Sequence, residues 1–221
     1  MIRFICAIHQ RPDISFAEFS RYWQTTHADI VLEFADPGPL LGYVQNERLA
    51  DAIDGIASDF DGAPDLWIRD SDAFGELMAA PRFQYAVDVD SPEFVQMPAI
   101  AFIIEEAVLH GPEDCAAMPG TVKLMLFFRR PDGADAPSFD EAWSTAQQSL
   151  LMPRAQPLRL ARALVQTPDG TPEASGFHGV ESSWWPDVNA LAEAWSDRQD
   201  MAGVSYARLV AQERIMLAPP G

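Results

Sequence analysis

The stretch FDGAPDLW at residues 60–67 recurs in altered form as FHGVESSW at residues 177–184. Both stretches begin with phenylalanine, carry glycine two positions later and end in tryptophan, at an offset of 117 residues (177 − 60). Two earlier segments match in the same order: RPD at 11–13 with 130–132, and SFAE at 15–18 with SFDE at 138–141. Short matches that keep their order along a chain indicate an internal repeat.

Each repeat predicts the element order β-α-β-β-α-β. In the first, apolar and β-branched runs predict strands at 2–9, 41–49, 65–68 and 99–109. Ser15, followed by Glu18, is a capping box that starts one helix, and Asp70 caps a second. In the second repeat we expect strands at 121–129, about 158–166, about 180–185 and 207–217, and helices at 138–151 and 187–196.

A ferredoxin-like unit of this kind places two helices on one face of a four-stranded sheet, so the other face must be covered. A second copy can cover it, sheet against sheet. We therefore predict an α+β fold in which two ferredoxin-like βαββαβ repeats form a pseudo-symmetric α+β barrel with antiparallel sheets, an intramolecular pseudo-dimer. The repeats span 1–109 and 121–221, and the Gly- and Pro-rich segment 110–120 is the expected linker.

Composition narrows the partners. The 221 residues carry a formal net charge of −18, which repels nucleic acids and anionic membranes. No run approaches the roughly 18 apolar residues of a membrane span, and the N-terminus shows no targeting leader. Cys6 and Cys115 do not make a disulfide framework, so we expect a cytoplasmic protein. Lys123 is the only lysine, which argues against Schiff-base chemistry.

Motifs for common cofactors are missing. The chain has no Gly-x-Gly-x-x-Gly after a strand, no phosphate loop and no Gly-x-Ser-x-Gly elbow. Its four histidines, His9, His27, His110 and His178, lack metal-ligand spacing. We therefore expect neither a bound cofactor nor a metal.

The candidate functional residues lie in the first repeat. Trp23 and His27 are four residues apart and share a helix face. His27 is either a hydrogen-bonded core histidine or a general acid or base. Asp65 shares a strand face with Trp67, where an acid requires a partner or a wet cavity, unless it starts the strand at the solvent edge.

Four blocks together resemble an EthD domain: RPDISFAEF at 11–19, YWQTTH at 22–27, GYVQN at 42–46 and FDGxxDLW at 60–67. This family belongs to the dimeric α+β barrel superfamily, and its relatives include cofactor-free enzymes that act on polyketide or other aromatic compounds. The resemblance implies a ligand cavity between sheet and helices, with His27 facing it. Where the family commonly has Glu two residues before the tryptophan, this chain has Asp65.

The second repeat departs further. With the capping boxes aligned, Leu150 takes the place of His27, while His178 and Ser182 take the places of Asp61 and Asp65. The second repeat thus lacks both the histidine and the acid. We expect one active cavity, formed mainly by the first repeat, and a structural role for the degenerate second repeat.

The leading hypothesis is a cofactor-free enzyme, a lyase or oxidoreductase, that acts by acid/base chemistry on a small hydrophobic, aromatic or polyketide-like carbonyl compound, for example by decarboxylation or isomerisation. His27 would transfer the proton, and Asp65 would orient the imidazole if the two meet. The expected substrate-binding residues are Trp23, Tyr43, Asp61 and Trp67. Two alternatives stay open: a non-catalytic small-molecule-binding accessory protein and a haem-binding protein. Further association into a homodimer is also open.

Overall fold

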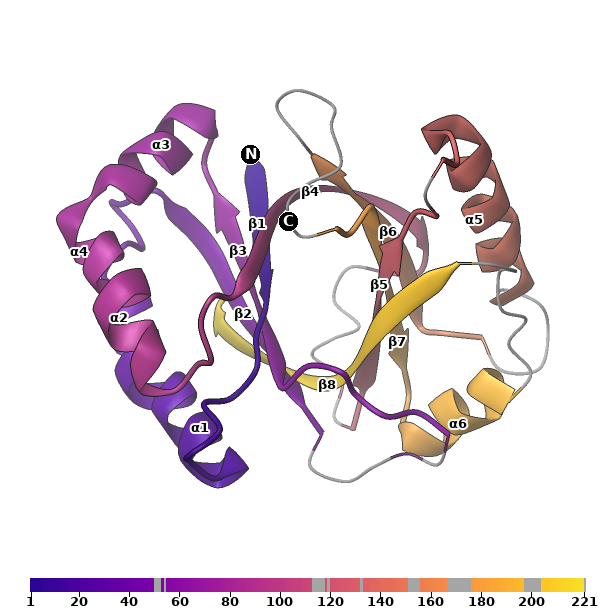
Figure 1. The fold of residues 1–221 in the computed structure, drawn as a ribbon, viewed down its shortest axis with the longest axis horizontal. Helices are drawn as coiled ribbons and strands as arrows, with labels where there is room; N and C mark the ends of the chain where they lie inside the picture. Colours follow the sequence, from indigo (N-terminus) through magenta and orange to yellow (C-terminus); the bar gives the residue numbers. More distant parts are fainter. Residues whose placement is uncertain are drawn as a thin grey trace. The chain divides into compact units, whose positions relative to one another are not determined.

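The computed structural model describes residues 1–49, 53, 55–112, 118, 120–131, 133–150, 156–166, 176–196 and 204–220 (Figure 1). Part of the expected linker, 113–117 and 119, and with it Cys115, lies outside the described residues. The chain divides into two compact units. Unit 1 comprises Met1–Glu47, Phe60–Ile104 and Glu213–Gly221, and unit 2 comprises Arg48–Asp59 and Glu105–Gln212.

Unit 1 contains the strands of the first repeat and an extended helical layer. Its strands are β1 (Ile2–Ala7), β2 (Leu40–Arg48), β3 (Gly62–Ile68) and the first part of β4 (Ile100–His110). Its α-helices are α1 (Phe16–Tyr22), α2 (Ala28–Leu32), α3 (Ser71–Ala79) and α4 (Pro81–Tyr85). Two π-helices, η1 (Trp23–His27) and η2 (Ala86–Asp90), and a 3₁₀ turn, η3 (Ser91–Glu93), complete it.

Unit 2 repeats this order with fewer helices. Its strands are β5 (Val122–Arg129), β6 (Arg159–Gln166), β7 (Gly179–Trp185) and most of β8 (Ser205–Leu217), and its described helices are α5 (Ala136–Leu150) and α6 (Val188–Ser196). In each unit the strands and helical segments thus follow the predicted order β-α-β-β-α-β. The capping box at Ser15 and the Asp70 cap occur as predicted.

Within each unit the paired strands are antiparallel. In unit 1, β1 lies between β4 and β3, and β3 pairs with β2. In unit 2, β5 lies between β8 and β7, and β7 pairs with β6. The long strands β4 and β8 belong to both units, and through them the strand order β1-β3-β2-β8-β5-β7-β6-β4 closes on itself. This is the connectivity of an antiparallel eight-stranded barrel, which confirms the α+β barrel prediction.

The units do not divide the chain at the expected linker. Residues 213–221 belong to unit 1, and residues 48–59 belong to unit 2, where Leu49 N donates to Val210 O at 2.9 Å and Asp59 N to Arg208 O at 2.7 Å. The reason is strand length: β8 continues beyond its pairing with β5, and β4 beyond its pairing with β1.

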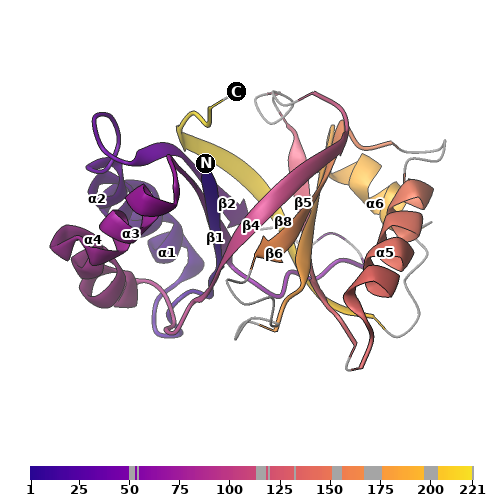
Figure 2. The ribbon, with the colours of Figure 1, turned by 90° about the horizontal axis from the view of Figure 1, so that it is seen from above.

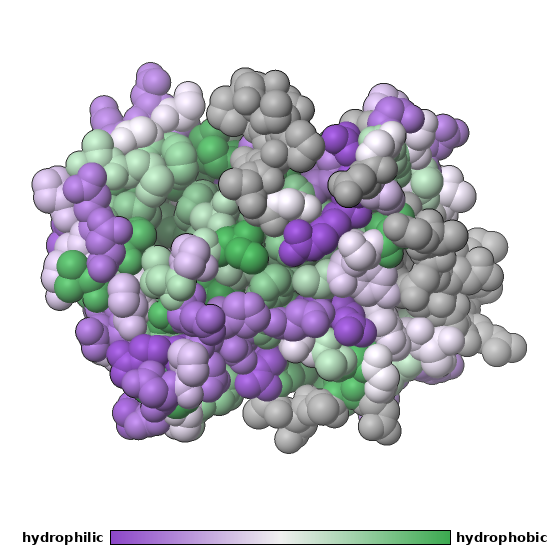
Figure 3. All heavy atoms as spheres, in the orientation of Figure 1, coloured by the Kyte–Doolittle hydropathy of each residue, from purple (hydrophilic) through white to green (hydrophobic). Residues whose placement is uncertain are grey.

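Within each unit the helices cover one sheet face. Figure 2 shows α1–α4 gathered beside the sheet of unit 1, and α5 and α6 beside the sheet of unit 2. Phe19 and Trp23 are fully buried under the unit 1 helices. On the outer side, Tyr85, Val87 and Val89 of α4 and η2 are exposed, and Figure 3 shows green apolar residues among purple ones over this helix layer.

One helix-to-sheet contact occurs in both units. A Cβ atom on Gly62 would lie 2.5 Å from Cζ3 of Trp23, and one on Gly179 would lie 2.5 Å from Cζ3 of Trp143. In each unit the helix tryptophan therefore occupies the space of a missing side chain on the third strand. The glycines match at the offset of 117 (179 − 62), and the tryptophans at 120 (143 − 23).

This contact corrects the alignment of the first helices. Asp135 accepts a hydrogen bond from Ser138 N and precedes α5, so it corresponds to Ser15 at the same offset of 120 (135 − 15). The helix begins three residues before the capping box that the sequence suggested. The counterpart of His27 is therefore Gln147 (147 − 27 = 120) and not Leu150. At the corrected position the second half of the chain therefore has glutamine in place of histidine.

Replacing Gly62 tests the contact between the Trp23 ring and Gly62. Gly62→Ala forces the new Cβ against the Trp23 ring, and we expect a loss of about 1–3 kcal/mol in the free energy of unfolding. Gly75→Ala in α3 is the matched control, because nothing lies within 4 Å of its Cβ position and alanine favours a helix interior. Urea denaturation should show opposite signs for the two variants; equal stability of Gly62→Ala and wild type would contradict the contact.

Candidate active site

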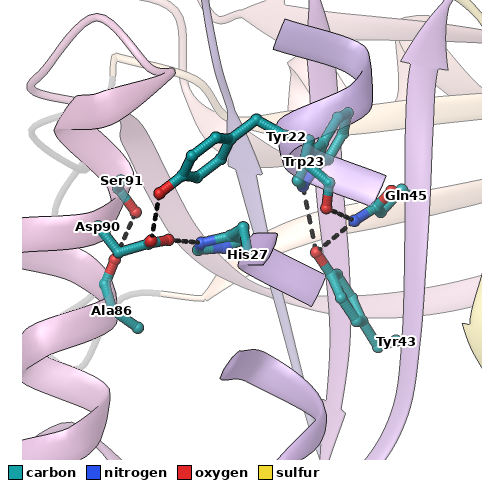
Figure 4. A network of polar contacts seen from close by, with 8 residues as sticks. All are labelled: Tyr22, Trp23, His27, Tyr43, Gln45, Ala86, Asp90 and Ser91. Atoms are coloured by element: carbon teal, nitrogen blue, oxygen red, sulfur yellow. Dashed lines mark hydrogen bonds and ion pairs between the residues drawn. The ribbon is translucent and has the colours of Figure 1, made fainter. Parts of the chain in front are cut away.

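Two π-helices bring together a histidine and an aspartate that are far apart in sequence. His27 is the last residue of η1, and Asp90 is the last residue of η2. π-Helical segments are rare, and they occur frequently at functional sites because the inserted residue redirects the side chains that follow. Figure 4 shows the two side chains pointing toward each other from their separate helices.

The aspartate is held from two sides. His27 Nδ1 lies 2.7 Å from Asp90 Oδ2, and the Tyr22 hydroxyl donates to Asp90 Oδ1 at 2.8 Å (Figure 4). The Asp90 side chain is 3% exposed and that of His27 12%. The pair is thus withdrawn from bulk water, and both carboxylate oxygens are engaged.

The local electrostatics favour an ionised Asp90. Burial alone would raise its pKa, but the hydrogen bonds from His27 and Tyr22 outweigh burial, and the pKa of Asp90 lies below the usual value of a carboxyl group. Burial and the hydrogen bond to Asp90 raise the pKa of Tyr22 to about 12. Tyr22 therefore remains a neutral donor across the physiological range.

The second nitrogen of His27, Nε2, is turned away from Asp90. A neutral imidazole that donates from Nδ1 to a carboxylate carries its lone pair on Nε2. Among the described residues no polar group contacts Nε2, and the ring packs against Phe94 with centroids 4.9 Å apart. The carboxylate of Asp90 thus orients the ring from Nδ1, and an aromatic ring packs against it.

Trp23 and Tyr43 meet beneath the same helix. Trp23 Nε1 donates to the Tyr43 hydroxyl at 3.1 Å, and Gln45 Nε2 donates to the same hydroxyl at 2.8 Å (Figure 4). All three side chains have no exposed surface. Burial is the main cause that raises the pKa of Tyr43, so its hydroxyl keeps its proton.

Asp65 does not meet His27. It forms a two-pronged ion pair with Arg3, with Nε to Oδ1 at 2.8 Å and Nη2 to Oδ2 at 2.6 Å. The Arg3 guanidinium also stacks over Trp67, 4.6 Å from the ring centroid. The expected orienting acid is thus corrected: Asp90 contacts His27, whereas Asp65 neutralises a buried arginine.

The sheet separates the expected site residues into two groups. Leu66 packs with Tyr43 under the helices, so its strand neighbours Asp65 and Trp67 lie on the opposite face. The side chains of Asp65 and Trp67 share a face, as strand alternation predicted. This face is turned away from His27. Trp67 therefore does not line the same place as Trp23.

Asp61 lies in the loop before β3. Its Oδ2 accepts a hydrogen bond from Gln10 N at 2.9 Å and lies 3.9 Å from Nδ1 of the half-exposed His9. These contacts join the end of the first strand to the loop. Asp61 is thus placed neither with His27 nor with Asp65 by any described contact.

Sequence reasoning missed Asp90, Tyr22 and Gln45. The sequence predicted no element over residues 81–93, so nothing marked Asp90. Tyr22 and Gln45 stand inside the EthD-like blocks, beside Trp23 and Tyr43, and that adjacency was the only available signal. Within the described residues, no group of three His, Cys, Asp or Glu side chains could hold a metal ion, and no helix is long and apolar enough to cross a membrane.

Comparisons with known proteins agree with this architecture. Residues 11–98 match the EthD domain family. None of the curated proteins matches the chain. Among solved structures, an anthrone oxidase-like protein superposes with a TM-score of 0.63 at 13% identity, covering 97% of this chain and 92% of that chain.

Two further structures show the same fold. A candidate chlorite dismutase has a TM-score of 0.57 at 9% identity, covering 97% of this chain and 95% of that chain. A candidate monooxygenase from Fusobacterium nucleatum has a TM-score of 0.52 at 10% identity, covering 97% and 93%. Identities this low indicate a shared fold and leave the reaction open.

Removing the charge of Asp90 should destabilise the protein in a pH-dependent way. The native pKa of Asp90 is lowered, so its stabilisation is full above the unfolded value of about 3.9 and is lost as pH falls through the native pKa. We expect Asp90→Asn to cost about 2 kcal/mol at pH 7 and less below about pH 4. Urea unfolding between pH 7 and pH 3 measures the difference, with Asp88→Asn, exposed on the same π-helix, as control.

Asp65→Asn should behave differently. It leaves Arg3 buried without its ion-pair partner, and we expect a loss of about 3–5 kcal/mol in the free energy of unfolding. Because Asp65 and His27 do not touch, the titration of the His27 ring followed by NMR should not change. A shift of that titration in Asp65→Asn, comparable to the shift in Asp90→Asn, would restore Asp65 as the orienting acid.

Proposed function

We propose that this protein, whose residues 11–98 match the EthD domain family, is a cofactor-independent enzyme that transfers a proton to or from a small hydrophobic carbonyl compound. The observation that carries the proposal is the His27–Asp90 pair, in which a buried carboxylate orients the imidazole from Nδ1. This is the arrangement by which a histidine becomes a general base.

The proposed step is the abstraction of a proton from a carbon next to a carbonyl group. His27 Nε2 takes the proton, the electron pair of the C–H bond moves into the carbonyl group, and an enolate and an imidazolium result. The charged Asp90 stabilises the imidazolium, and Tyr22 holds the aspartate in place. Return of the proton to a different position of the enolate gives isomerisation. In a β-keto carboxylate, cleavage of the bond to carbon dioxide leaves its electron pair in the same kind of enolate without prior proton abstraction, and a protonated His27 would then donate the proton that completes decarboxylation.

The substrate class follows from the surroundings of His27. Phe94 packs on its ring, and Trp23 lies one helical turn away with Phe19 beside it, at a centroid distance of 5.5 Å. Aromatic walls favour a flat, hydrophobic ligand. The anthrone oxidase-like protein, whose name refers to an aromatic ketone, supports the same class, so we propose an aromatic or polyketide-like ketone.

The roles of the remaining expected residues follow their positions. We assign Trp23 to the apolar wall and the Tyr43 hydroxyl to a substrate oxygen, because both lie under the helix that carries His27. Asp65 and Trp67, with Arg3, we assign to structure on the opposite sheet face, and Asp61 to the join between β1 and β3.

The second unit supports our proposal that the chain has a single active cavity, formed by the first unit. The recurring tryptophan–glycine contact and the shared β-α-β-β-α-β order support our proposal that the chain is a tandem duplication of one ferredoxin-like repeat. The second repeat has Gln147 and Ser182 where the first has His27 and Asp65. We propose that it serves as a structural half.

A non-catalytic binding protein is the alternative. The same tyrosine, tryptophan and histidine would then hold a metabolite without turnover. The binding-protein hypothesis uses the same contacts as the enzyme hypothesis, but it does not require His27 Nε2 to accept a proton. The two hypotheses therefore differ only in whether a proton is transferred.

Hydrogen–deuterium exchange tests the proton transfer. 2-Tetralone, an aromatic ketone with acidic C1 hydrogens, is incubated with the full chain in D₂O and followed by proton NMR. We expect faster exchange with wild type, and a loss of at least about 100-fold in His27→Gln, the usual contribution of a general base. His9→Gln, which changes a half-exposed histidine, should exchange as wild type does.

The same measurement separates the alternatives. Anthrone, whose acidic C10 hydrogens are conjugated with the carbonyl group through the aromatic rings, should likewise exchange faster with wild type. Tight binding of either ketone by wild type without enhanced exchange would favour the binding protein. Equal exchange in wild type and His27→Gln would remove His27 from the reaction.

A further inference from the structure

The Tyr43 hydroxyl receives two hydrogen bonds and gives none within the described residues. Trp23 Nε1 and Gln45 Nε2 both donate to it, which uses the acceptor capacity of the oxygen. Among the described residues the hydroxyl proton has no acceptor. Tyr43 is fully buried, and such a proton normally has a partner.

Within the described part of the chain, Gln45 has a buried acceptor without a donor, whereas Tyr43 has a buried donor without an acceptor. Its Nε2 donates to the Trp23 carbonyl at 2.8 Å as well as to the Tyr43 hydroxyl, whereas its Oε1 is buried without a partner. Turning the amide over would offer Oε1 to the Tyr43 proton, but it would place that oxygen 2.8 Å from the Trp23 carbonyl oxygen, where two acceptors repel. The orientation of the amide is therefore dictated by the Trp23 carbonyl.

One buried donor and one buried acceptor thus remain side by side. Both belong to residues with no exposed surface, and a buried polar group without a partner typically costs about 1–3 kcal/mol. A hydroxyl group has one proton to give and lone pairs to receive another. A single hydroxyl between the two residues would satisfy both.

Unit 2 shows that a tryptophan can pack against a strand glycine without an unpartnered donor and acceptor nearby. Trp143 packs on Gly179 as Trp23 packs on Gly62, but its indole N–H donates to Glu181 Oε2 at 3.3 Å.

The strand register identifies the counterparts of the two residues. Tyr43 faces Leu66 across the strands, and Leu160 faces Ser183 at the same offset, 117 (183 − 66). Arg162 likewise corresponds to Gln45 (162 − 45 = 117). Unit 2 thus has a leucine and an arginine at these positions, and no unpartnered buried atom is found on either. The spare donor and acceptor of unit 1 are therefore a separate feature of that unit.

We propose that Tyr43 and Gln45 form a subsite that binds a hydroxyl group of the substrate, with Tyr43 donating to its oxygen and Gln45 Oε1 accepting its proton. The inference rests on the proposed function and deepens it, because it narrows the substrate to a hydroxylated aromatic ketone. Trp23 links the subsite to the active site: its indole and carbonyl contact Tyr43 and Gln45, and His27 follows one helical turn later. A substrate that reaches both places would carry its hydroxyl group and its acidic C–H about one helical turn apart.

Three matched ketones test the subsite: 6-hydroxy-2-tetralone, 6-methoxy-2-tetralone and 2-tetralone. The methoxy compound can accept from Tyr43 but cannot donate to Gln45. Binding to the full chain is measured by calorimetry at one salt concentration and pH. We expect wild type to bind the hydroxy compound about tenfold more tightly than the methoxy compound, the size of one net hydrogen bond.

Gln45→Met provides the first variant, because methionine keeps the length of the side chain and removes the Oε1 acceptor, together with the two hydrogen bonds that Nε2 donates. The hydroxy-to-methoxy preference should fall to about one. Tyr43→Phe is the second variant, with the same expectation, and it keeps the Gln45 bond to the Trp23 carbonyl, so the test stands even if Gln45→Met does not fold. Near-ultraviolet circular dichroism checks the fold of both.

The outcomes are distinct from those of the proton-transfer test. A hydroxyl preference that depends on Gln45, without enhanced exchange, would support the subsite and overturn the proposed reaction. Enhanced exchange with equal affinity for the hydroxy and methoxy compounds would overturn the subsite. Equal affinities together with a more stable Gln45→Met variant would also overturn it, and would assign the two groups to a buried water molecule.

Discussion

The seat of Trp23 on Gly62 is the contact on which the rest of unit 1 depends. Because residue 62 has no side chain, the indole lies directly against β3, and this fixes the height of the first helix above the sheet. The same tryptophan then offers its indole N–H to Tyr43 and its carbonyl to Gln45. Its position therefore sets both the hydrogen bonds beneath the helix and the place at which η1 begins.

From that fixed start, the π-helical geometry of η1 decides where His27 points. A second π-helix presents Asp90, and the two meet at 2.7 Å although 63 residues separate them. Burial makes an ionised aspartate costly, and the bonds from His27 and Tyr22 more than offset that cost. The pair can persist only because two irregular helices and one tyrosine are held together by the aromatic packing around Phe94.

Periodic signals predicted the regular elements, and they failed where the structure depends on irregular backbone. Strand alternation placed β1 to β8 to within about two residues at most ends, and it correctly put Asp65 and Trp67 on one face. Alternation cannot tell which face a sheet turns to its helices, so Asp65 was assigned to the wrong partner. A π-helix has no recognised sequence signature, and Asp90 lies in one, so no pattern pointed to it. The capping-box alignment erred for a related reason: Asp135 caps α5 as effectively as a serine, three residues before the SFDE segment.

The two units together separate what the fold requires from what a function would require. Both bury a tryptophan against a glycine, and both place a cation over the tryptophan of the third strand, Arg3 over Trp67 and Lys123 over Trp184. These shared contacts belong to the architecture. The His27–Asp90 pair on two π-helices and the spare hydrogen-bonding groups of Tyr43 and Gln45 are found in unit 1. Unit 2 has a different histidine–aspartate contact, with His178 Nε2 lying 3.1 Å from Asp140 Oδ1. Uncompensated polar groups lower stability, and those of Tyr43 and Gln45 lie beneath the helix that carries His27, which argues that they are maintained for a ligand.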